Sequence, residues 1–376
     1  MNNLTYLVDI CDFQGGTQPP KKQWSKFLKD GYIRMLQIRD FTQFEKVEPE
    51  YVKYSTKLKT CKSDDILIAR YGASLGKILT GLSGAYNVAI MKTIPNENKI
   101  TKKYLYYYFL SDSFQNTIKN FGSRAAQAGF NKEDLSLIKL KCPSIEKQEE
   151  QCLVLNYIYN LIDKRRRQIL LLDKLVKSRF IEMFGDPLKN TLKWKIKKLK
   201  LIAPANEFTG DIESNNEKYW LLQLDMIESN TGKILSKYFV SLDKIGVSTI
   251  KFSRDNVLYS KLRPYLNKVV LPDEAGFATS EMIPLFPTEE LNKIFLAFVL
   301  RDDGIVRFLN AHVSGSKMPR VQADVFWNLG IILPPSTLQN QFADFVEQTD
   351  KSKLEIQKSL DKLEVLKKSL MQQYFG

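Results

Sequence analysis

Two stretches of the chain place a mostly apolar side chain at every seventh position. The first covers residues 146–184 and repeats on Leu155, Ile162, Ile169, Val176 and Met183. The second covers residues 336–376 and repeats on Phe342, Thr349, Ile356, Leu363 and Leu370. A spacing of seven keeps these side chains on one helix face and is typical of helices that pack against another long helix. We therefore predict two helices of about 55–60 Å each, paired with each other as an antiparallel coiled coil. The alternative is that each helix packs on its own domain.

The regions outside these helices have a different pattern. Residues 1–145 and 185–335 contain short β-like apolar runs, turns rich in Gly and Pro, and one longer helical stretch each, at 101–120 and 289–309. Such a mixture predicts an α+β domain rather than a regular alternation of strand and helix. The predicted order is domain 1–145, central spacer helix 146–184, domain 185–335 and C-terminal spacer helix 336–376.

The two halves of the chain repeat each other at an offset of 191 residues. The segment DDILIARYGASLGK around Asp65 aligns with DNVLYSKLRPYLNK around Asn256, so that Arg70 matches Lys261 and Lys77 matches Lys268. Both predicted helices also end in Phe-Gly. We therefore predict two globular domains in tandem pseudo-repeat, and we expect each domain to bind the same kind of partner.

The charge of the chain favours a polyanionic partner. The formal net charge is +14 at pH 7. Residues 1–145 carry 22 Lys and Arg against 13 Asp and Glu, whereas residues 185–335 carry 20 against 17. A basic surface of this kind suggests nucleic acid, although a basic protein that binds no polyanion remains the alternative.

Several short motifs together carry a family resemblance. They are GGTQPP (15–20), GYIRMLQIRD (31–40), ARYGASLGK (69–77), AYNVA (85–89), LLDKLVKSRFIEMFGDP (171–187), LRPYLNKVV (262–270) and SGSKMPRV (314–321). With this architecture, the chain resembles the specificity subunits of type I restriction-modification systems, the HsdS family. The resemblance covers essentially the whole chain.

The resemblance implies a function and a set of partners. Each globular domain would be a target recognition domain for one half of a split sequence in double-stranded DNA. The two helices would act as a spacer and dock two methyltransferase subunits. The candidate contacts are the exposed faces of both helices and the residues Phe180, Met183 and Phe184. A restriction subunit would be a further partner. S-adenosylmethionine, ATP and Mg²⁺ are then expected in partner subunits, and no cofactor is expected in this chain.

Candidate DNA-binding residues lie in the turns and loops of both domains. Basic side chains neutralise phosphates, whereas polar and aromatic groups contact base edges. The candidates are Thr17, Gln18, Gln37, Arg39, Arg70, Ser74, Lys77, Ser123, Arg124, Lys261, Arg263, Tyr265, Lys268, Ser316, Lys317 and Arg320.

Three local interpretations accompany these candidates. Gly15 and Gly16 would permit positive φ, whereas Gly72 and Gly76 would let the backbone approach DNA closely. Gln37 and Arg39 alternate with apolar residues, which suggests the polar face of a strand. Arg39 could contact guanine, or it could pair with a neighbouring carboxylate, Asp40 or Glu45.

The sequence lacks a recognisable catalytic or metal-binding motif. Neither Pro-Pro pair fits an adenine methyltransferase motif, and GASLGK is one residue too short for a phosphate-binding loop. The four cysteines form no C-x-x-C pair and His312 is the only histidine, so we expect no metal site and no catalytic residue. Alternatives remain open: a divergent fused methyltransferase or nuclease, an orphan specificity protein, or a coiled-coil scaffold without a nucleic-acid role.

The chain also shows no sign of membrane association. No apolar run approaches the length of about 20 residues that spans a bilayer. The first residues, MNNLTYLVDICD, lack the basic start and apolar core of a signal peptide. We therefore expect a cytoplasmic protein.

Overall fold

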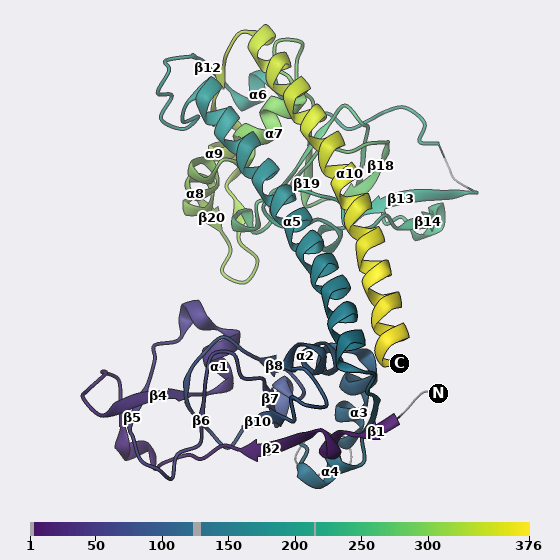
Figure 1. Ribbon diagram of the computed structural model, residues 1–376. Coiled ribbons are helices and arrows are strands. Elements are labelled where there is room, and N and C mark those ends of the chain that lie inside the picture. Colours follow the sequence, from purple (N-terminus) through teal and green to yellow (C-terminus); the bar gives the residue numbers. More distant parts are fainter. Residues whose placement is uncertain (1–3, 123–128, 214–215) are drawn as a thin grey trace. The chain divides into compact units, whose positions relative to one another are not determined.

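The structure is a computed structural model that describes residues 4–122, 129–213 and 216–376. It divides into a first unit, residues 1–166 with 357–376, and a second unit, residues 167–356. The division passes through two long helices, α5 (Ile145–Phe184) and α10 (Ser336–Phe375). Each unit therefore consists of one globular part, part of α5 and part of α10 (Figure 1).

Two β-sheets form the main part of the first unit. The larger has the strand order β3-β5-β4-β9-β6, and the other has the order β2-β10-β7-β8. β4 and β9 run parallel, and β1 pairs separately with β11. The strands are β1 (Leu4–Tyr6), β2 (Cys11–Gly15), β3 (Trp24–Ser25), β4 (Tyr32–Leu36), β5 (Tyr51–Lys53), β6 (Thr60–Cys61), β7 (Leu67–Ala69), β8 (Ile78–Leu79), β9 (Gly84–Tyr86), β10 (Ile90–Pro95) and β11 (Lys139–Lys141).

The second unit has a similar topology, with one strand fewer in each of its two main sheets. Its sheets have the orders β14-β13-β18-β15 and β17-β16-β19, and the parallel pair β13 and β18 corresponds to β4 and β9. β12 pairs with β22 as β1 does with β11, and β20 pairs with β21. The strands are β12 (Lys195–Lys198), β13 (Lys218–Leu222), β14 (Phe239–Ser241), β15 (Thr249–Phe252), β16 (Val257–Ser260), β17 (Val269–Val270), β18 (Gly276–Thr279), β19 (Met282–Leu285), β20 (Val313–Ser314), β21 (Arg320–Val321) and β22 (Gly330–Leu333).

The prediction of a single helix at 101–120 and at 289–309 is wrong, because each of these two segments forms two helices. The short helices are α1 (Ile38–Thr42), α2 (Lys102–Leu110), α3 (Asp112–Gly122), α4 (Lys132–Ser136), α6 (Leu199–Ile202), α7 (Lys293–Arg301), α8 (Asp303–Ala311) and α9 (Ala323–Trp327). The breaks fall at Ser111 and Asp302. The Asp302 carboxylate accepts the backbone N–H groups of Gly304 and Ile305, at 2.8 and 3.2 Å, and so starts a new helix.

The two Phe-Gly signatures mark equivalent packing positions. Phe184, at the end of α5, packs on Phe295 of α7 with ring centroids 4.8 Å apart. Phe375, at the end of α10, packs on Tyr104 of α2 at 5.0 Å. Each long helix thus inserts its last aromatic ring into the core of a globular part.

This packing corrects the expected methyltransferase contacts. Phe184 is fully buried, and Phe180 is only 4% exposed. Met183 is half-buried against the same core. The two phenylalanines therefore stabilise the second unit and are not available to a partner.

A buried glutamine repeats at the start of both long helices. The Gln148 carboxamide donates to the carbonyls of Lys99 and Pro143, at 2.9 Å each, and accepts the N–H of Thr101 at 2.9 Å. Gln339 makes the same three kinds of bond in the second unit. Both side chains are fully buried. Each therefore joins a long helix to the chain segment that begins α2 or α7.

Within each unit the two long helices run antiparallel. In the first unit, Arg166 of α5 pairs with Glu364 of α10 at 2.6 Å. In the same unit, Lys367 of α10 lies over the Tyr159 ring of α5 at 5.5 Å, so residue numbers rise along one helix as they fall along the other. In the second unit, Asp173 pairs with Lys353 at 2.9 Å and Phe180 packs on Phe342 with ring centroids 5.4 Å apart, which gives the same direction. The predicted α+β fold, with tandem domains and a long antiparallel helix pair, is confirmed.

The predicted seam positions differ in their burial. The buried members are Leu155, Ile162, Val176, Phe342 and Thr349. The half-buried members are Ile169, Met183, Ile356, Leu363 and Leu370.

Across the described ranges, no helix is both long and apolar enough to span a membrane.

Candidate nucleic-acid interface

An equivalent turn follows strand β7 in the first unit and strand β16 in the second. Each contains one short helical turn, Gly72–Ser74 and Pro264–Leu266. Gly72 and Gly76 have φ of 69° and 78°, and the aligned residues Arg263 and Asn267 have φ of 50° and 48°. Positive φ therefore explains both glycines, and the expected close approach of this backbone to DNA stays a prediction.

These turns pack against the segments that precede α4 and α9. In the first unit, Tyr71 forms a β-bridge with Gly129. In the second, Leu262 bridges Arg320, and the Arg263 N–H donates to the Pro319 carbonyl at 2.7 Å. Each unit thus brings together two loops that lie about 60 residues apart in the sequence.

Arg70 is held inside this arrangement in the first unit. Its guanidinium donates to the Phe130 carbonyl at 3.3 and 3.4 Å and to the Val88 carbonyl at 3.5 Å. It also lies over the ring of Tyr71, 5.0 Å from the centroid. Arg70 therefore fastens the turn to its neighbours, whereas Lys77 in the same turn is exposed.

The GGTQPP loop lies against the backbone around β9. A Cβ on Gly16 would lie 2.1 Å from the Asn87 carbonyl oxygen, so close approach explains this glycine. The expected positive φ is wrong for both Gly15 and Gly16. The Thr17 hydroxyl accepts the Lys59 N–H at 3.1 Å, while Gln18 is exposed.

The carboxylate of Glu50 accepts hydrogen bonds from three side chains of the first unit. It accepts from Lys21 and Arg39 at 2.6 Å each, and from the Gln37 amide at 3.1 Å. Burial raises the pKa of Glu50, but the hydrogen bonds and charges of Lys21 and Arg39 lower it further, so the net shift is downward. The sequence predictions missed Glu50 because its partners lie 11 to 29 residues away.

The expected strand at Gln37 and Arg39 is wrong. Gln37 is the N-cap of α1, and its backbone N–H donates to the Asp40 carboxylate at 2.8 Å. Arg34, and not Arg39, pairs with Asp40 at 2.9 Å. The reciprocal cap of Gln37 and Asp40 favours a helical turn over a strand at this position.

In the second unit, two of the candidate cations are already engaged. Arg320 binds Glu281 through two nitrogens, with contacts of 2.5 to 3.1 Å. The hydrogen bond from Arg320 lowers the pKa of Glu281. Lys268 donates to the Leu224 carbonyl, and burial lowers the pKa of its amine.

The remaining candidates differ in exposure. Gln18, Lys77, Arg263, Tyr265, Ser316 and Lys317 are exposed. Ser74 and Lys261 are half-buried, and Ser123 and Arg124 lie outside the described residues. Neither Arg263 nor Lys317 has a side-chain partner in the part of the chain that the structure describes. These two cations are therefore free to bind a ligand.

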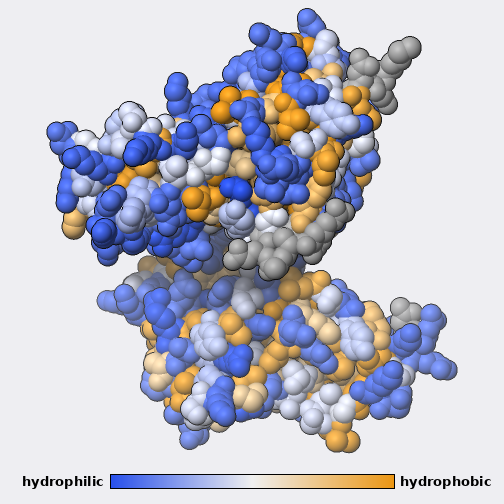
Figure 2. Space-filling view, turned by 90° about the horizontal axis from the view of Figure 1, so that it is seen from below, coloured by the Kyte–Doolittle hydropathy of each residue, from blue (hydrophilic) through white to orange (hydrophobic). Residues whose placement is uncertain are grey.

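A further basic surface borders the small strands of the first unit. On the face drawn in Figure 2, hydrophilic residues cover much of the surface between hydrophobic ones. The exposed lysines of this region are Lys22, Lys26, Lys29, Lys53 and Lys57. Phe27 and Tyr54 are exposed among them, at 76% and 55%. The clustering of lysine at 21–29 was the sequence signal for this surface.

Cys11, Cys61 and Cys152 are buried thiols, and the ring of His312 contacts the backbone. Burial raises the pKa of Cys11 to about 12, and those of Cys61 and Cys152 to about 11, so their thiolates are scarce near neutral pH. The His312 ring nitrogen contacts the Phe308 carbonyl at 2.8 Å. The described residues contain no group of three His, Cys, Asp or Glu side chains that could hold a metal ion.

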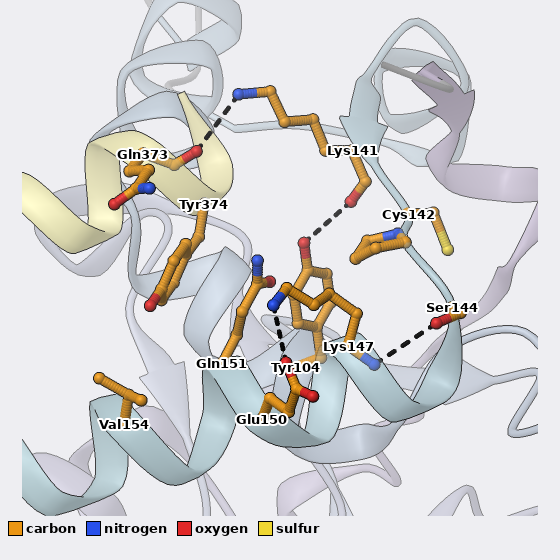
Figure 3. A pocket seen from close by; sticks show the side chains of 11 residues that line it. Tyr104, Lys141, Cys142, Ser144, Lys147, Glu150, Gln151, Val154, Gln373 and Tyr374 are labelled. Atoms are coloured by element: carbon orange, nitrogen blue, oxygen red, sulfur yellow. Dashed lines mark hydrogen bonds and ion pairs between the residues drawn. The ribbon is translucent and has the colours of Figure 1, made fainter. Parts of the chain in front are cut away.

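A pocket of about 540 Å³ lies where α2, the start of α5 and the end of α10 meet (Figure 3). Several of its polar groups bind one another, but the buried Gln151 Oε1 has no hydrogen-bond partner among the described residues. Lys147 pairs with Glu150 at 2.7 Å, and the Tyr104 hydroxyl donates to the Lys141 carbonyl at 3.1 Å. The pocket contains none of the candidate DNA-binding residues.

Two equivalent units, each with exposed polar and basic loops on the same backbone frame, define a tandem DNA-binding protein. The sequence model of the type I restriction modification DNA specificity domain matches residues 5–171 and 192–368. The chain belongs to this family. The resemblance drawn from the motifs is confirmed, and so is DNA sequence recognition as the function.

Individual relatives agree with the family assignment. The specificity subunit of type I restriction enzyme MjaVIII from Methanocaldococcus jannaschii is 24% identical, over 86% of this chain and 81% of that protein. The MjaIX specificity subunit from the same organism is 20% identical, over 97% and 90%. The S subunit structure from M. genitalium has a TM-score of 0.60 at 14% identity, and it covers 100% of this chain and 96% of that chain.

Proposed function

We propose that the chain reads a bipartite, asymmetric DNA target, with one half-site for each unit. The observation that carries this proposal is the turn after β7 and β16. Its backbone has positive φ at the same two positions in both units, yet the side chains there are Gly72 and Gly76 in one unit and Arg263 and Asn267 in the other. A shared frame with different side chains supports recognition of two different sequences.

We further propose that the chain has no catalytic activity and docks two methyltransferase subunits and a restriction subunit. These partners would supply S-adenosylmethionine, ATP and Mg²⁺ chemistry in the cytoplasm. The relatives named as specificity subunits of type I restriction enzymes support this division of labour. Binding of S-adenosylmethionine or cleavage of DNA by the purified chain alone would instead favour a fused enzyme.

Selection of bound DNA from a random duplex library tests the proposal directly. The full chain, purified with its methyltransferase partners, should enrich two short, different motifs separated by unspecified base pairs. Mapping of N6-methyladenine in the host genome should give the same bipartite site. A palindrome, or one continuous motif, would contradict two independent units.

Salt dependence separates this function from that of a coiled-coil scaffold. If six or more phosphates are contacted, affinity should fall by roughly 10³-fold between 50 and 200 mM salt. A scaffold without a nucleic-acid role would show no measurable DNA binding at either concentration.

A further inference from the structure

Arg263 occupies a backbone conformation that its side chain opposes. It has φ of 50° and ψ of 63°, in the left-handed region that glycine occupies freely. It also precedes Pro264, and a residue before proline favours extended conformations. The aligned residue in the first unit is Gly72, which adopts positive φ without this conflict.

The contacts of the turn impose this conformation. The Arg263 N–H donates to Pro319, and the Arg263 carbonyl accepts the Leu266 N–H at 2.9 Å. Pro264 is buried beside them. The backbone frame is therefore maintained by the neighbouring loop and does not depend on the arginine side chain.

The guanidinium of Arg263 does not compensate for the strain within the protein. It is exposed, and no partner for it is found among the described residues. The guanidinium groups of Arg70, Arg301 and Arg320, by contrast, all bind carbonyls or a carboxylate. Strained backbone conformations cluster at functional sites, and at Arg263 the strain coincides with the turn that each unit packs against a second loop.

We propose that Arg263 reads a guanine in the half-site bound by the second unit, with its two-pronged guanidinium on O6 and N7 of the base. Such a contact is the commonest specific contact of arginine in the major groove. Tyr265 lies in the same turn, and Lys317 lies in the loop on which the turn packs. This inference rests on the proposed function and assigns one residue to one base.

The decisive variant is Arg263→Gly, which keeps the backbone frame and removes the side chain. The melting temperature should rise by about 2–6 °C, because the strain at positive φ is relieved. Binding to the cognate site should weaken by roughly 5- to 150-fold, with loss of preference at one guanine only.

A matched control variant is available in the same unit. Lys193 is exposed and has φ of 58°, so Lys193→Gly removes the same charge and relieves the same kind of strain. Its melting temperature should rise similarly while its base preferences remain unchanged. The variant Arg263→Lys keeps the charge but not the fork, so it should also lose the guanine preference.

The outcomes separate the inference from the proposed function. Replacement of the critical guanine by 7-deazaguanine should weaken the parent complex but not the Arg263→Gly complex. Unchanged base preferences in Arg263→Gly, or an equal loss of affinity for all sequences, would overturn the inference. If the parent complex itself selects no sequence, the proposed function fails.

Discussion

Replacing Gln148 or Gln339 by alanine should destabilise the unit that contains the residue. Each carboxamide makes three hydrogen bonds to backbone groups at a fully buried position. Alanine would leave one N–H and two carbonyls without these partners. A buried polar group that loses its partner costs about 1–3 kcal/mol.

The expected loss of folding free energy for either variant is smaller than the sum of three such penalties. The space vacated by the carboxamide is polar, and a water molecule there could restore some of the hydrogen bonds. We therefore expect a loss of about 3 kcal/mol for either variant. For a unit of this size, that corresponds to a fall in melting temperature of about 6–12 °C.

Thermal unfolding followed by calorimetry and circular dichroism measures this effect. The two variants should destabilise different units, so each should shift a different transition if the units unfold separately. Gln341→Ala and Gln372→Ala are matched controls, because both glutamines are exposed on α10. A fall of less than about 2 °C for Gln148→Ala and Gln339→Ala would refute this reasoning.

Two further predictions concern carboxylates that hold candidate DNA-binding cations. Glu50→Gln should release Lys21 and Arg39 from an ionised partner, so binding to unrelated DNA should strengthen and its salt slope should steepen by about one. The Kd for unrelated DNA, measured at several salt concentrations, tests this effect, and an unchanged Kd and salt slope would contradict it. Because Arg320 lowers the pKa of Glu281, the pair should stabilise the fold above the unfolded pKa of about 4.3 and stop doing so as pH falls through the lower, folded pKa. The melting temperatures of the parent and Glu281→Gln should therefore differ at neutral pH and converge in acid, and a pH-independent difference would count against the ion pair.

The sequence predicted the features that depend on local periodicity. The seven-residue pattern was sufficient to identify α5 and α10, because packing against a second helix imposes that spacing on the sequence. It did not reveal the breaks at Ser111 and Asp302, although both residues are of a type that caps helices. Helix α1 was missed because five residues are too few to establish a helical period.

The side-chain partners in the candidate interface could not be predicted from the sequence. Glu281 meets Arg320 across 39 residues, and Arg70 meets Phe130 across 60. Such contacts follow from the packing of loops in three dimensions and leave no periodic trace in the sequence. Residue type alone therefore does not distinguish an arginine held by the fold, such as Arg70, from one free to bind DNA, such as Arg263.

The turn after β7 and β16 shows how one frame can support different recognition. Its shape is set by backbone hydrogen bonds and by positive φ at two positions, so a side chain at those positions is tolerated at a cost but not required. In the first unit, the two glycines place no side chain at these positions, and the exposed residues nearby include Lys77. In the second, an arginine projects from the turn itself. A change of this kind alters what a unit can contact without altering its fold, so the same architecture can hold two half-sites of different sequence.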